Sequence, residues 1–468
     1  MSEFETAVRA TRDRGELFSR DRPIYIARSP GRLDLMGGND DYTGGMVFEA
    51  TIREATWAAA QLRADESIVL LNPQMREQGW QDRVEFCLSE LTDSETVRAL
   101  VNRDPNVRWT AYVLGVFFWL KENHPQQTRA GMEVLIHSEV PLNKGVSSSA
   151  AVEVAVMKAA ARAYGIELSG VALAEACQWV ENVIAESACG IMDQIAVVLG
   201  DEGYVLPLVC QTCLPQPLVR LPAGLACWGL DSGVRHQVSG VEYEAARAAA
   251  FMGYKLICDW EAIPVEFDSG SNIPRWTDPR FQGYLANLSP SSFIAYEARL
   301  PEILSGSDYL PLAKVHVDPF TKVRPEVNYR VRACTRYAVE ENHRVQLFAE
   351  LARGMNESPA PSGALLMGEL MYQSHEAYTD TGLGCKQTDL LVALARQQGP
   401  ERGIFGAKIT GGGGGGTVAI LGRTDATDPL QQIVDAYRAS TGIEAYLFQG
   451  SSMGADRFGI VVVEPSSK

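Results

Sequence analysis

Three consecutive serines, Ser147, Ser148 and Ser149, follow Lys144 and Gly145 in a loop between a predicted strand and a predicted helix. Hydroxyl groups can donate hydrogen bonds to phosphate oxygens or ligate a magnesium ion, and a glycine lets the backbone approach a ligand closely. The first N–H groups of a helix lack partners within the helix, and the dipole there is positive, which favours anionic oxygens. The loop is therefore a candidate phosphate site. An ordinary serine N-cap after a polar turn is the alternative.

The elements on either side of this loop follow from hydrophobic spacing. Residues 131–137 form the apolar run of a buried strand, and residues 152–164 are helix formers with apolar residues at helical spacing. Another amphipathic helix is predicted over 171–186, with Glu181 and Glu186 in its C-terminal half. Because the helix dipole disfavours acids at that end, these two glutamates are out of place as mere surface residues.

A glycine-punctuated segment near the N-terminus, residues 28–45, is dense with candidate ligands. A short strand over 24–27 precedes it, and a strand over 46–52 leaves it. Alternating apolar residues over 55–61 and 67–71 then predict a hairpin-rich sheet.

Six consecutive glycines occupy residues 411–416, between predicted strands over 404–410 and 418–421. Such a run is typical of a flexible linker, but linkers are not normally bracketed by apolar strands. We therefore expect a tight turn that passes something bulky. Further predicted elements of this half of the chain are helices over 328–353, 363–378, 386–398 and 429–440 and strands over 226–230, 445–448 and 460–463.

The length of 468 residues predicts two domains of about 200 residues each. Residues 261–325 lack clear periodicity and are expected to form a long irregular insertion. The net charge of −16 argues against nucleic-acid binding, and the absence of an apolar run of 18 residues argues against a membrane span. Nine scattered cysteines and a charged start predict free thiols in a cytoplasmic protein. We expect a monomer or a weak homodimer.

Three segments together resemble the GHMP small-molecule kinase superfamily: residues 30–38, 141–151 and 408–416, supported by Cys-Gly-Ile-Met-Asp-Gln over 189–194. Within it the galactokinase branch is most similar. The residues of these segments resemble those of the kinase portion of plant-type L-arabinokinases. The resemblance implies an α+β fold of two lobes with the active site in the cleft. A ribosomal-S5-like lobe would span 1–220 and a ferredoxin-like lobe 221–468.

The resemblance also implies roles for the reacting groups. Ser148 and Glu181 match the Mg²⁺ ligands of galactokinase-like enzymes, a pair of hard oxygen donors. Asp193 matches the aspartate beside the anomeric hydroxyl, and Arg32 matches its partner. Because a neighbouring arginine favours the ionised carboxylate, Asp193 would orient the hydroxyl and take its proton late in phosphoryl transfer. A purely structural ion pair is the alternative for Arg32 and Asp193.

The remaining implied contacts divide between sugar and ATP. The sugar would meet Asp34, Gly38, Asn39, Asp41, Gly190 and Tyr243. ATP would meet Lys144, Gly145, Val146, Ser147, Ser148, Ser149, Ala150, Gly412 and Gly413, and Trp109 could flank the adenine. Arg235 and His236 also match the family pattern. Tyr243 as a core residue is the alternative to a sugar contact.

The sugar loop departs from the galactokinase pattern at one place. Where galactokinases carry Glu-His toward the C6 hydroxyl, this chain has Gly38-Asn39, while Asp41 is kept. L-Arabinopyranose has the ring stereochemistry of D-galactose without the C6 group, and polar groups left unpaired can cost roughly 10⁴ to 10⁵ in specificity. We therefore expect an ATP- and Mg²⁺-dependent L-arabinose 1-kinase. Galactose could still enter the space expected beside Gly38, so galactokinase is the alternative.

A non-catalytic sensor of sugar and ATP is a second alternative, because the galactokinase branch includes such regulators. Those proteins shorten the serine-alanine part of the phosphate loop. Here the run from Ser147 to Ala151 is uninterrupted and Asp193 is present, so catalysis is the favoured interpretation.

Overall fold

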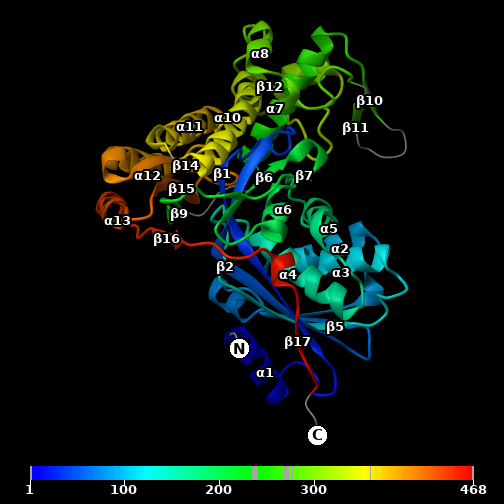
Figure 1. The fold of residues 1–468 in the computed structure, drawn as a ribbon. Coiled ribbons are helices and arrows are strands. Elements are labelled where there is room, and N and C mark those ends of the chain that lie inside the picture. Colours follow the sequence, from blue (N-terminus) through cyan, green and yellow to red (C-terminus); the bar gives the residue numbers. More distant parts are fainter. Residues whose placement is uncertain (1–2, 235–240, 268–273, 277, 359, 466–468) are drawn as a thin grey trace.

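The first and larger of the two main sheets is built around two long strands near the N-terminus (Figure 1). The structure is a computed structural model that describes residues 3–234, 241–267, 274–276, 278–358 and 360–465. The strands of this first sheet are β1 (Ile24–Met36), β2 (Met46–Leu62), β3 (Ser67–Leu71), β4 (Arg83–Cys87), β5 (Met132–Ser138), β6 (Tyr204–Val209), β7 (Leu214–Pro215), β8 (Val219–Arg220) and β17 (Val461–Val463). The strand order is β17-β1-β2-β5-β3-β4, and β6 pairs with β2, β7 and β8. All of these pairs are antiparallel except β3 with β5.

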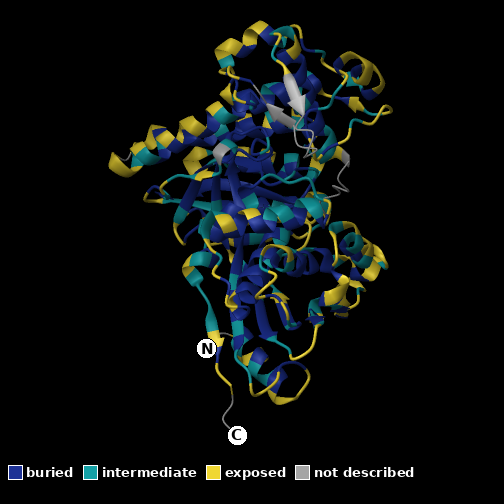
Figure 2. Ribbon diagram, turned by 90° about the vertical axis from the view of Figure 1, so that its right-hand side faces the viewer, coloured by how far each residue is buried: buried dark blue, intermediate teal, exposed yellow. Residues whose placement is uncertain are grey.

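Helices cover both faces of this sheet. They are α1 (Glu3–Asp13), α2 (Ser94–Asn102), α3 (Ala111–Asn123), α4 (Ser148–Ala163), α5 (Gly170–Val183) and α6 (Met192–Leu199). Successive residues of β2 point to opposite faces, as the pleat requires. Ala58 and Ala60 belong to the core under α3 to α6, whereas Ala59 belongs to the smaller core under Phe4 and Val8 of α1. The sheet is thus buried on both sides (Figure 2).

The second sheet is antiparallel, in the order β14-β15-β9-β16. Its strands are β9 (Leu225–Asp231), β14 (Ile404–Ile409), β15 (Thr417–Arg423) and β16 (Tyr446–Gln449), and the helices with it are α10 (Val331–Glu357), α11 (Pro361–Asp380), α12 (Lys386–Gln398) and α13 (Thr427–Thr441). Val418 and Ile420 face a core with α12 and α13. Ala419 faces a core that contains Phe348 of α10 and Leu33 of β1, so this core joins the two lobes.

The described residues between 261 and 325 contain more regular structure than their composition predicts. They follow α7 (Val241–Trp260) and contain α8 (Pro290–Glu297) and α9 (Gly306–Ala313), with short strands β10 (Val265–Phe267), β11 (Pro274–Trp276) and β12 (Leu304–Ser305), the last paired with β13 (Asn328–Tyr329). The prediction of an irregular connection is therefore partly wrong. The missed signals are the serine N-caps: Ser289 accepts a hydrogen bond from the Ser292 N–H and Ser305 from the Asp308 N–H.

The observed strands β1 and β2 are longer than the strands predicted for these residues. The strand predicted over 24–27 continues to Met36, and the two strands predicted over 46–61 are one. The glycine-rich turn signals were misleading here, because bulges at Pro30/Arg32 and Asp34/Met36 absorb the irregularity without ending β1. Short 3₁₀ turns complete the described part of the chain at η1 (Pro73–Gln78), η2 (Leu88–Glu90), η3 (Pro105–Thr110), η4 (Cys210–Thr212), η5 (Leu285–Asn287) and η6 (Pro400–Arg402).

The end of the chain returns to the first sheet. The short helix α14 (Ala455–Phe458) packs on α6 and β1, and Val461 to Val463 pair with Ile24 to Ile26. A division at residue 220 stays a prediction, but these last elements lie on the N-terminal lobe. No helix in the described ranges combines the length and the apolar composition needed to cross a membrane.

Candidate active site between the lobes

The serine loop opens directly into α4, as its sequence predicts. Ser147 occupies the N-cap in a left-handed conformation with φ 60° and makes no capping hydrogen bond with its side chain. Its buried Oγ has no hydrogen-bond partner within the described residues. The alternative of an ordinary serine cap therefore does not describe this loop, because the hydroxyl does not satisfy the helix. An unpaired hydroxyl at a helix start suits an anionic ligand, and phosphate binding stays a prediction.

The glycine run meets this loop backbone to backbone, which confirms the expected tight turn. A Cβ on Gly411 would lie 2.6 Å from the Gly145 carbonyl oxygen, and one on Gly416 would lie 2.7 Å from the Lys144 carbonyl oxygen. Thr417 Oγ1 also donates to the Lys144 carbonyl at 2.8 Å. Glycine is required at these two positions because no side chain fits between the loops. The six glycines thus bring the C-terminal lobe against the phosphate loop.

Lys144 is held by the C-terminal lobe as well. Its Nζ lies 2.9 Å from Asp231 Oδ2, at the end of β9. The charge predicted to face ATP is therefore engaged with a carboxylate. Both side chains are mostly buried, so this ion pair is a second link between the lobes.

Arg32 and Asp193 lie together at the centre of the site. Arg32 is 2% exposed, and its Nε and Nη2 both donate to Asp193 Oδ1, at 2.9 and 2.6 Å. Its Nη1 donates to the Gly145 carbonyl at 2.7 Å, which ties it to the phosphate loop. Both bonds from Arg32 reach Oδ1, and the Asp193 side chain is 22% exposed, so a contact between Oδ2 and a ligand stays a prediction. Asp193 itself stands in the first turn of α6.

Glu49 of β2 is a member of this site that sequence reasoning missed. Its Oε2 lies 3.2 Å from Arg32 Nε, and neither oxygen has a hydrogen-bond partner within the described residues. Burial, together with the negative charge of Asp34, raises the pKa of Glu49 well above its usual value. The one available signal was a lone acid inside the apolar run of a predicted strand.

Asp41 and Gly190, both predicted to meet the sugar, are in contact with each other. A Cβ on Gly190 would overlap the Asp41 carboxylate, and Asp41 Oδ1 accepts from the Tyr42 N–H at 2.9 Å. Burial and the charge of Asp193 raise the pKa of Asp41 to about 6, against the lowering effect of Arg247. A cavity of about 460 Å³ opens beside both residues, and Asp193 is not among its lining residues.

The space expected beside Gly38 is filled. A Cβ on Gly38 would overlap Asp34 Oδ2, and this oxygen pairs with Lys408 Nζ at 2.7 Å. Both Asp34 and Lys408 are fully buried. The expectation that Gly38 leaves open room for galactose is therefore wrong, because the Asp34–Lys408 ion pair occupies that room.

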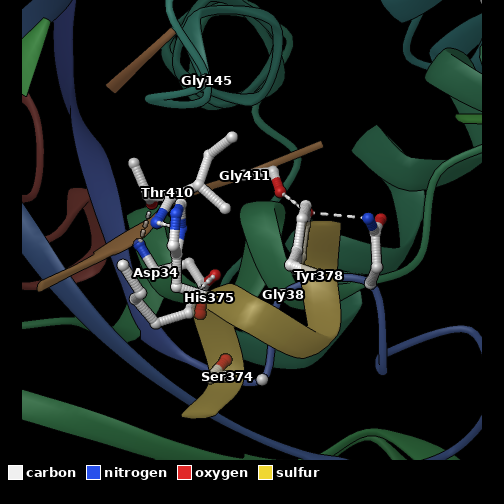
Figure 3. A network of polar contacts seen from close by, with 12 residues as sticks. Asp34, Gly38, Gly145, Ser374, His375, Tyr378, Thr410 and Gly411 are labelled. Atoms are coloured by element: carbon white, nitrogen blue, oxygen red, sulfur yellow. Dashed lines mark hydrogen bonds and ion pairs between the residues drawn. The ribbon is translucent and has the colours of Figure 1, made fainter. Parts of the chain in front are cut away.

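Two tyrosines of the C-terminal lobe hold the same loop. Asn39 Nδ2 donates to Tyr378 Oη at 2.7 Å, and Tyr378 in turn donates to the Gly411 carbonyl (Figure 3). Tyr337 donates to the Gly38 carbonyl. The loop that carries the predicted sugar residues is thus fixed by helices α10 and α11.

Glu181 lies beside the start of α4, where the resemblance requires a metal ligand. It is buried and accepts from Gln194 Nε2 at 2.7 Å, and Ser149 hydrogen-bonds to it. Burial and the charge of Asp193 raise the pKa of Glu181 to about 7. Glu153, also buried, lies close to Glu181, and burial together with the charge of Glu181 raises the pKa of Glu153 well above its usual value. Neither glutamate forms an ion pair with a basic side chain in the described part of the protein.

This donor set fits Mg²⁺. Glu181 and the serine hydroxyls are hard oxygen donors, and the charge of a bound Mg²⁺ would favour the ionised form of Glu181. Mg²⁺ in kinases typically keeps waters and uses one or two carboxylates with substrate phosphates. No group of three or more His, Cys, Asp or Glu side chains that could hold a metal ion occurs among the described residues. Ser148 and Glu181 would hold the ion together with phosphate oxygens.

The roles of the other predicted contact residues stay predictions. The Trp109 indole N–H donates to the Gln81 carbonyl at 2.8 Å and its ring packs on the core of the first lobe. Tyr243 of α7 stacks edge-on against Tyr42, with ring centroids 6.0 Å apart. Gly413 faces Tyr378 and Leu383. Arg235 and His236 lie outside the described residues.

Family comparisons agree with this arrangement. A model described as the GHMP kinases N terminal domain matches residues 111–201, and one described as GHMP kinases C terminal matches residues 341–439. A galactokinase galactose-binding signature matches residues 15–62. The chain belongs to the GHMP kinase family. The fold class predicted from the sequence is thereby confirmed, and the three matches place this GHMP kinase among the sugar kinases.

Two sequence relatives and two solved structures resemble this GHMP kinase over most of its length. An L-arabinokinase of Arabidopsis thaliana is 34% identical over 98% of the chain, which spans 49% of that relative. A galactokinase of Chloroflexus aurantiacus is 31% identical over 90% of each chain. The structure of a Lactococcus lactis galactokinase complexed with galactose has a TM-score of 0.74 at 22% identity and covers 96% of this chain and 99% of its own. A Methanococcus jannaschii mevalonate kinase has a TM-score of 0.54 at 15% identity, with coverage of 92% and 98%. These structures share the fold.

Proposed function

We propose that this GHMP kinase transfers the γ-phosphoryl group of ATP to the anomeric hydroxyl of L-arabinose, giving L-arabinose 1-phosphate and ADP. The observation that supports the choice of sugar is the Gly38 position. No side chain starts there, and Asp34, paired with Lys408, fills the place of a Cβ. A galactose C6 hydroxyl therefore gains no partner from residue 38, whereas a pentose needs none. The 34% identity to an L-arabinokinase supports the same sugar.

Asp193 and Arg32 would act on the reacting atoms. Asp193 Oδ2 would accept a hydrogen bond from the anomeric hydroxyl and take its proton late in the transfer. Arg32 would offset negative charge on the moving phosphoryl group from its place between Asp193 and the Gly145 carbonyl. Phosphoryl transfer depends mostly on such positioning and electrostatic stabilisation.

The phosphate loop would supply the nucleotide end. The N–H groups at the start of α4 and the hydroxyls of Ser147 to Ser149 would bind phosphate oxygens. Bound Mg²⁺, held by Ser148 and Glu181, would neutralise charge on the phosphates. The glycine run would close the loop from the other lobe and exclude water from it.

Galactose is the second candidate substrate, because a galactokinase at 31% identity spans 90% of both chains. The test is ADP release by the purified protein with ATP and Mg²⁺ across a panel that contains L-arabinose and D-galactose. We expect the highest kcat/KM with L-arabinose. A higher kcat/KM with D-galactose would overturn the arabinose assignment in favour of galactokinase.

A further inference from the structure

Arg247 is a buried arginine that the proposed reaction does not use. It lies one helical turn after Tyr243 on α7 and is 4% exposed. Its Nε and Nη2 donate to the two oxygens of Asp318, at 2.7 and 2.9 Å, in a bidentate pair. Its Nη1 donates to the Ala188 carbonyl at 3.2 Å, just before Gly190. Planar guanidinium groups in such pairs fix geometry as well as charge.

Aromatic rings from three segments surround the same guanidinium. The distances from its carbon to the ring centroids are 5.0 Å for Tyr42, 5.3 Å for Phe320 and 5.7 Å for Phe251. Tyr42 directly follows Asp41 in the sugar loop. The arginine therefore contacts the sugar loop, the segment before α6, its own helix α7 and the 261–325 insertion at once.

Asp318 is itself fixed in the insertion. Its carboxylate accepts from Thr321 Oγ1 at 2.7 Å and from the Phe320 N–H at 3.3 Å, in addition to the two bonds from Arg247. Its side chain is fully buried. Although burial opposes its charge, the Arg247 charge and hydrogen bonds hold the pKa of Asp318 below its usual value. This carboxylate is thus an ionised anchor for Arg247.

The insertion also contacts the sugar loop directly. The Ala286 N–H donates to the Thr43 carbonyl at 3.3 Å, and the Tyr284 ring lies where a Cβ on Gly44 would be. Asn342 of α10 joins the two, since it donates to the Ala286 carbonyl and accepts from the Met46 N–H. One side of the loop that carries Asp41 is therefore built from the insertion.

We propose that Arg247 and Asp318 are positioning residues for sugar binding, which hold the Asp41–Tyr42 loop and the Ala188–Gly190 segment in one arrangement, and that the insertion is for this reason a part of the sugar site. The proposal rests on the proposed sugar kinase function. Neither residue needs to touch the sugar. Their loss should raise the KM for the sugar and leave the KM for ATP nearly unchanged, because the phosphate loop has its own contacts with the C-terminal lobe.

The test compares Asp318→Asn, Asp318→Glu and Asp259→Asn in the full chain. Asp259 pairs with Lys255 on the same helix α7, away from the cavity-lining residues, and is the matched control. With the sugar of highest kcat/KM in the wild type, we expect Asp318→Asn to raise the sugar KM by ~10- to 100-fold and to change the ATP KM less than ~2-fold. Asp318→Glu should recover part of the loss. An unchanged sugar KM in Asp318→Asn, or an equal rise in both KM values, would overturn the proposal.

A second variant separates positioning from stability. Replacing a buried ion pair by apolar residues of similar volume is often neutral for stability. The double variant Arg247→Met/Asp318→Leu should therefore unfold near the wild-type temperature yet keep the raised sugar KM. A wild-type sugar KM in this variant would show that only packing matters and would overturn the positioning role. A wild type that turns over no sugar in the panel would overturn the proposed function and this inference with it.

Discussion

The carboxylate of Asp34 stands where the side chain of residue 38 would begin, so that glycine at 38 and the buried ion pair between Asp34 and Lys408 require each other. The pair joins β1 of one lobe to β14 of the other. Any residue larger than glycine at position 38 must move Asp34, and any movement of Asp34 leaves a buried ammonium group without its partner.

The first prediction concerns stability at this position. We expect Gly38→Ala to lower the free energy of unfolding by ~1 to 3 kcal/mol, because the added methyl group overlaps Asp34 Oδ2. Denaturant unfolding measures the change. Gly354→Ala is the control, since a Cβ there meets no atom within 4 Å and the residue lies inside α10; that variant should be stabilised by up to ~1 kcal/mol. Equal stability of Gly38→Ala and the wild type would contradict the crowding of Gly38.

The second prediction concerns the sugar. Restoring the galactokinase pattern by Gly38→Glu/Asn39→His should yield little active protein while Asp34 remains in place. With Asp34→Ala added, the glutamate has room and can face Lys408, and we expect the ratio of kcat/KM for L-arabinose to that for D-galactose to fall by at least ~10-fold. The sugar panel measures this ratio. An unaltered ratio in an active triple variant would mean that residue 38 does not set the preference.

The third prediction concerns Asp193. Asp193→Asn keeps the size of the side chain and removes its charge, so kcat should fall by ~10²- to 10⁴-fold while sugar binding persists. ADP release measures the rate, and the sugar-induced shift of the unfolding temperature measures binding. Asp435→Ala, an exposed acid on α13, is the control for loss of charge elsewhere. Wild-type turnover in Asp193→Asn would remove this aspartate from the mechanism, and a wild type that binds sugar without turnover would favour the sensor alternative.

The fourth prediction concerns pH. The pKa of Asp41 is raised to about 6, chiefly by burial, so its carboxylate is lost as the pH falls from 7 to 5. We expect kcat/KM for the sugar to fall by up to ~10-fold per pH unit below that pKa, with little change in the KM for ATP. In Asp41→Asn, kcat/KM for the sugar should be low at every pH and should no longer depend on pH in this range.

Thermal unfolding at each pH provides the control for acid unfolding. A carboxyl group whose pKa is higher in the folded state than the usual 3.8 stabilises the folded state at low pH, and this contribution is lost as the pH rises through about 6. The contribution of Asp41 to stability thus grows over the range in which activity falls. A sugar profile without an acid limb between pH 5 and 7 would show that Asp41 is not needed as a carboxylate.

The sequence alone predicted those parts of the site that are formed by a few consecutive residues. The serines at the start of α4 and the glycines after β14 are recognisable because a few consecutive residues define a loop. The helices α4, α5 and α10 to α13 follow from their apolar spacing, whereas shorter helices such as α8 and α9 were not predicted. Lys408 and Asp34, by contrast, are 374 residues apart and Arg247 and Asp318 are 71 apart. No local pattern encodes such a pair, because it forms only when distant elements pack. The crowding at Gly38 was missed for this reason.

The pairing of β17 with β1 determines when the first sheet can be completed during translation. The first sheet contains both residues 24–26 and residues 461–463, which are its partners. During translation β1 therefore presents an unpaired edge until residues 461–463 have left the ribosome, and such edges invite association with other chains. Most of the N-terminal lobe is thus synthesised before the C-terminal lobe, but its sheet is completed only afterwards.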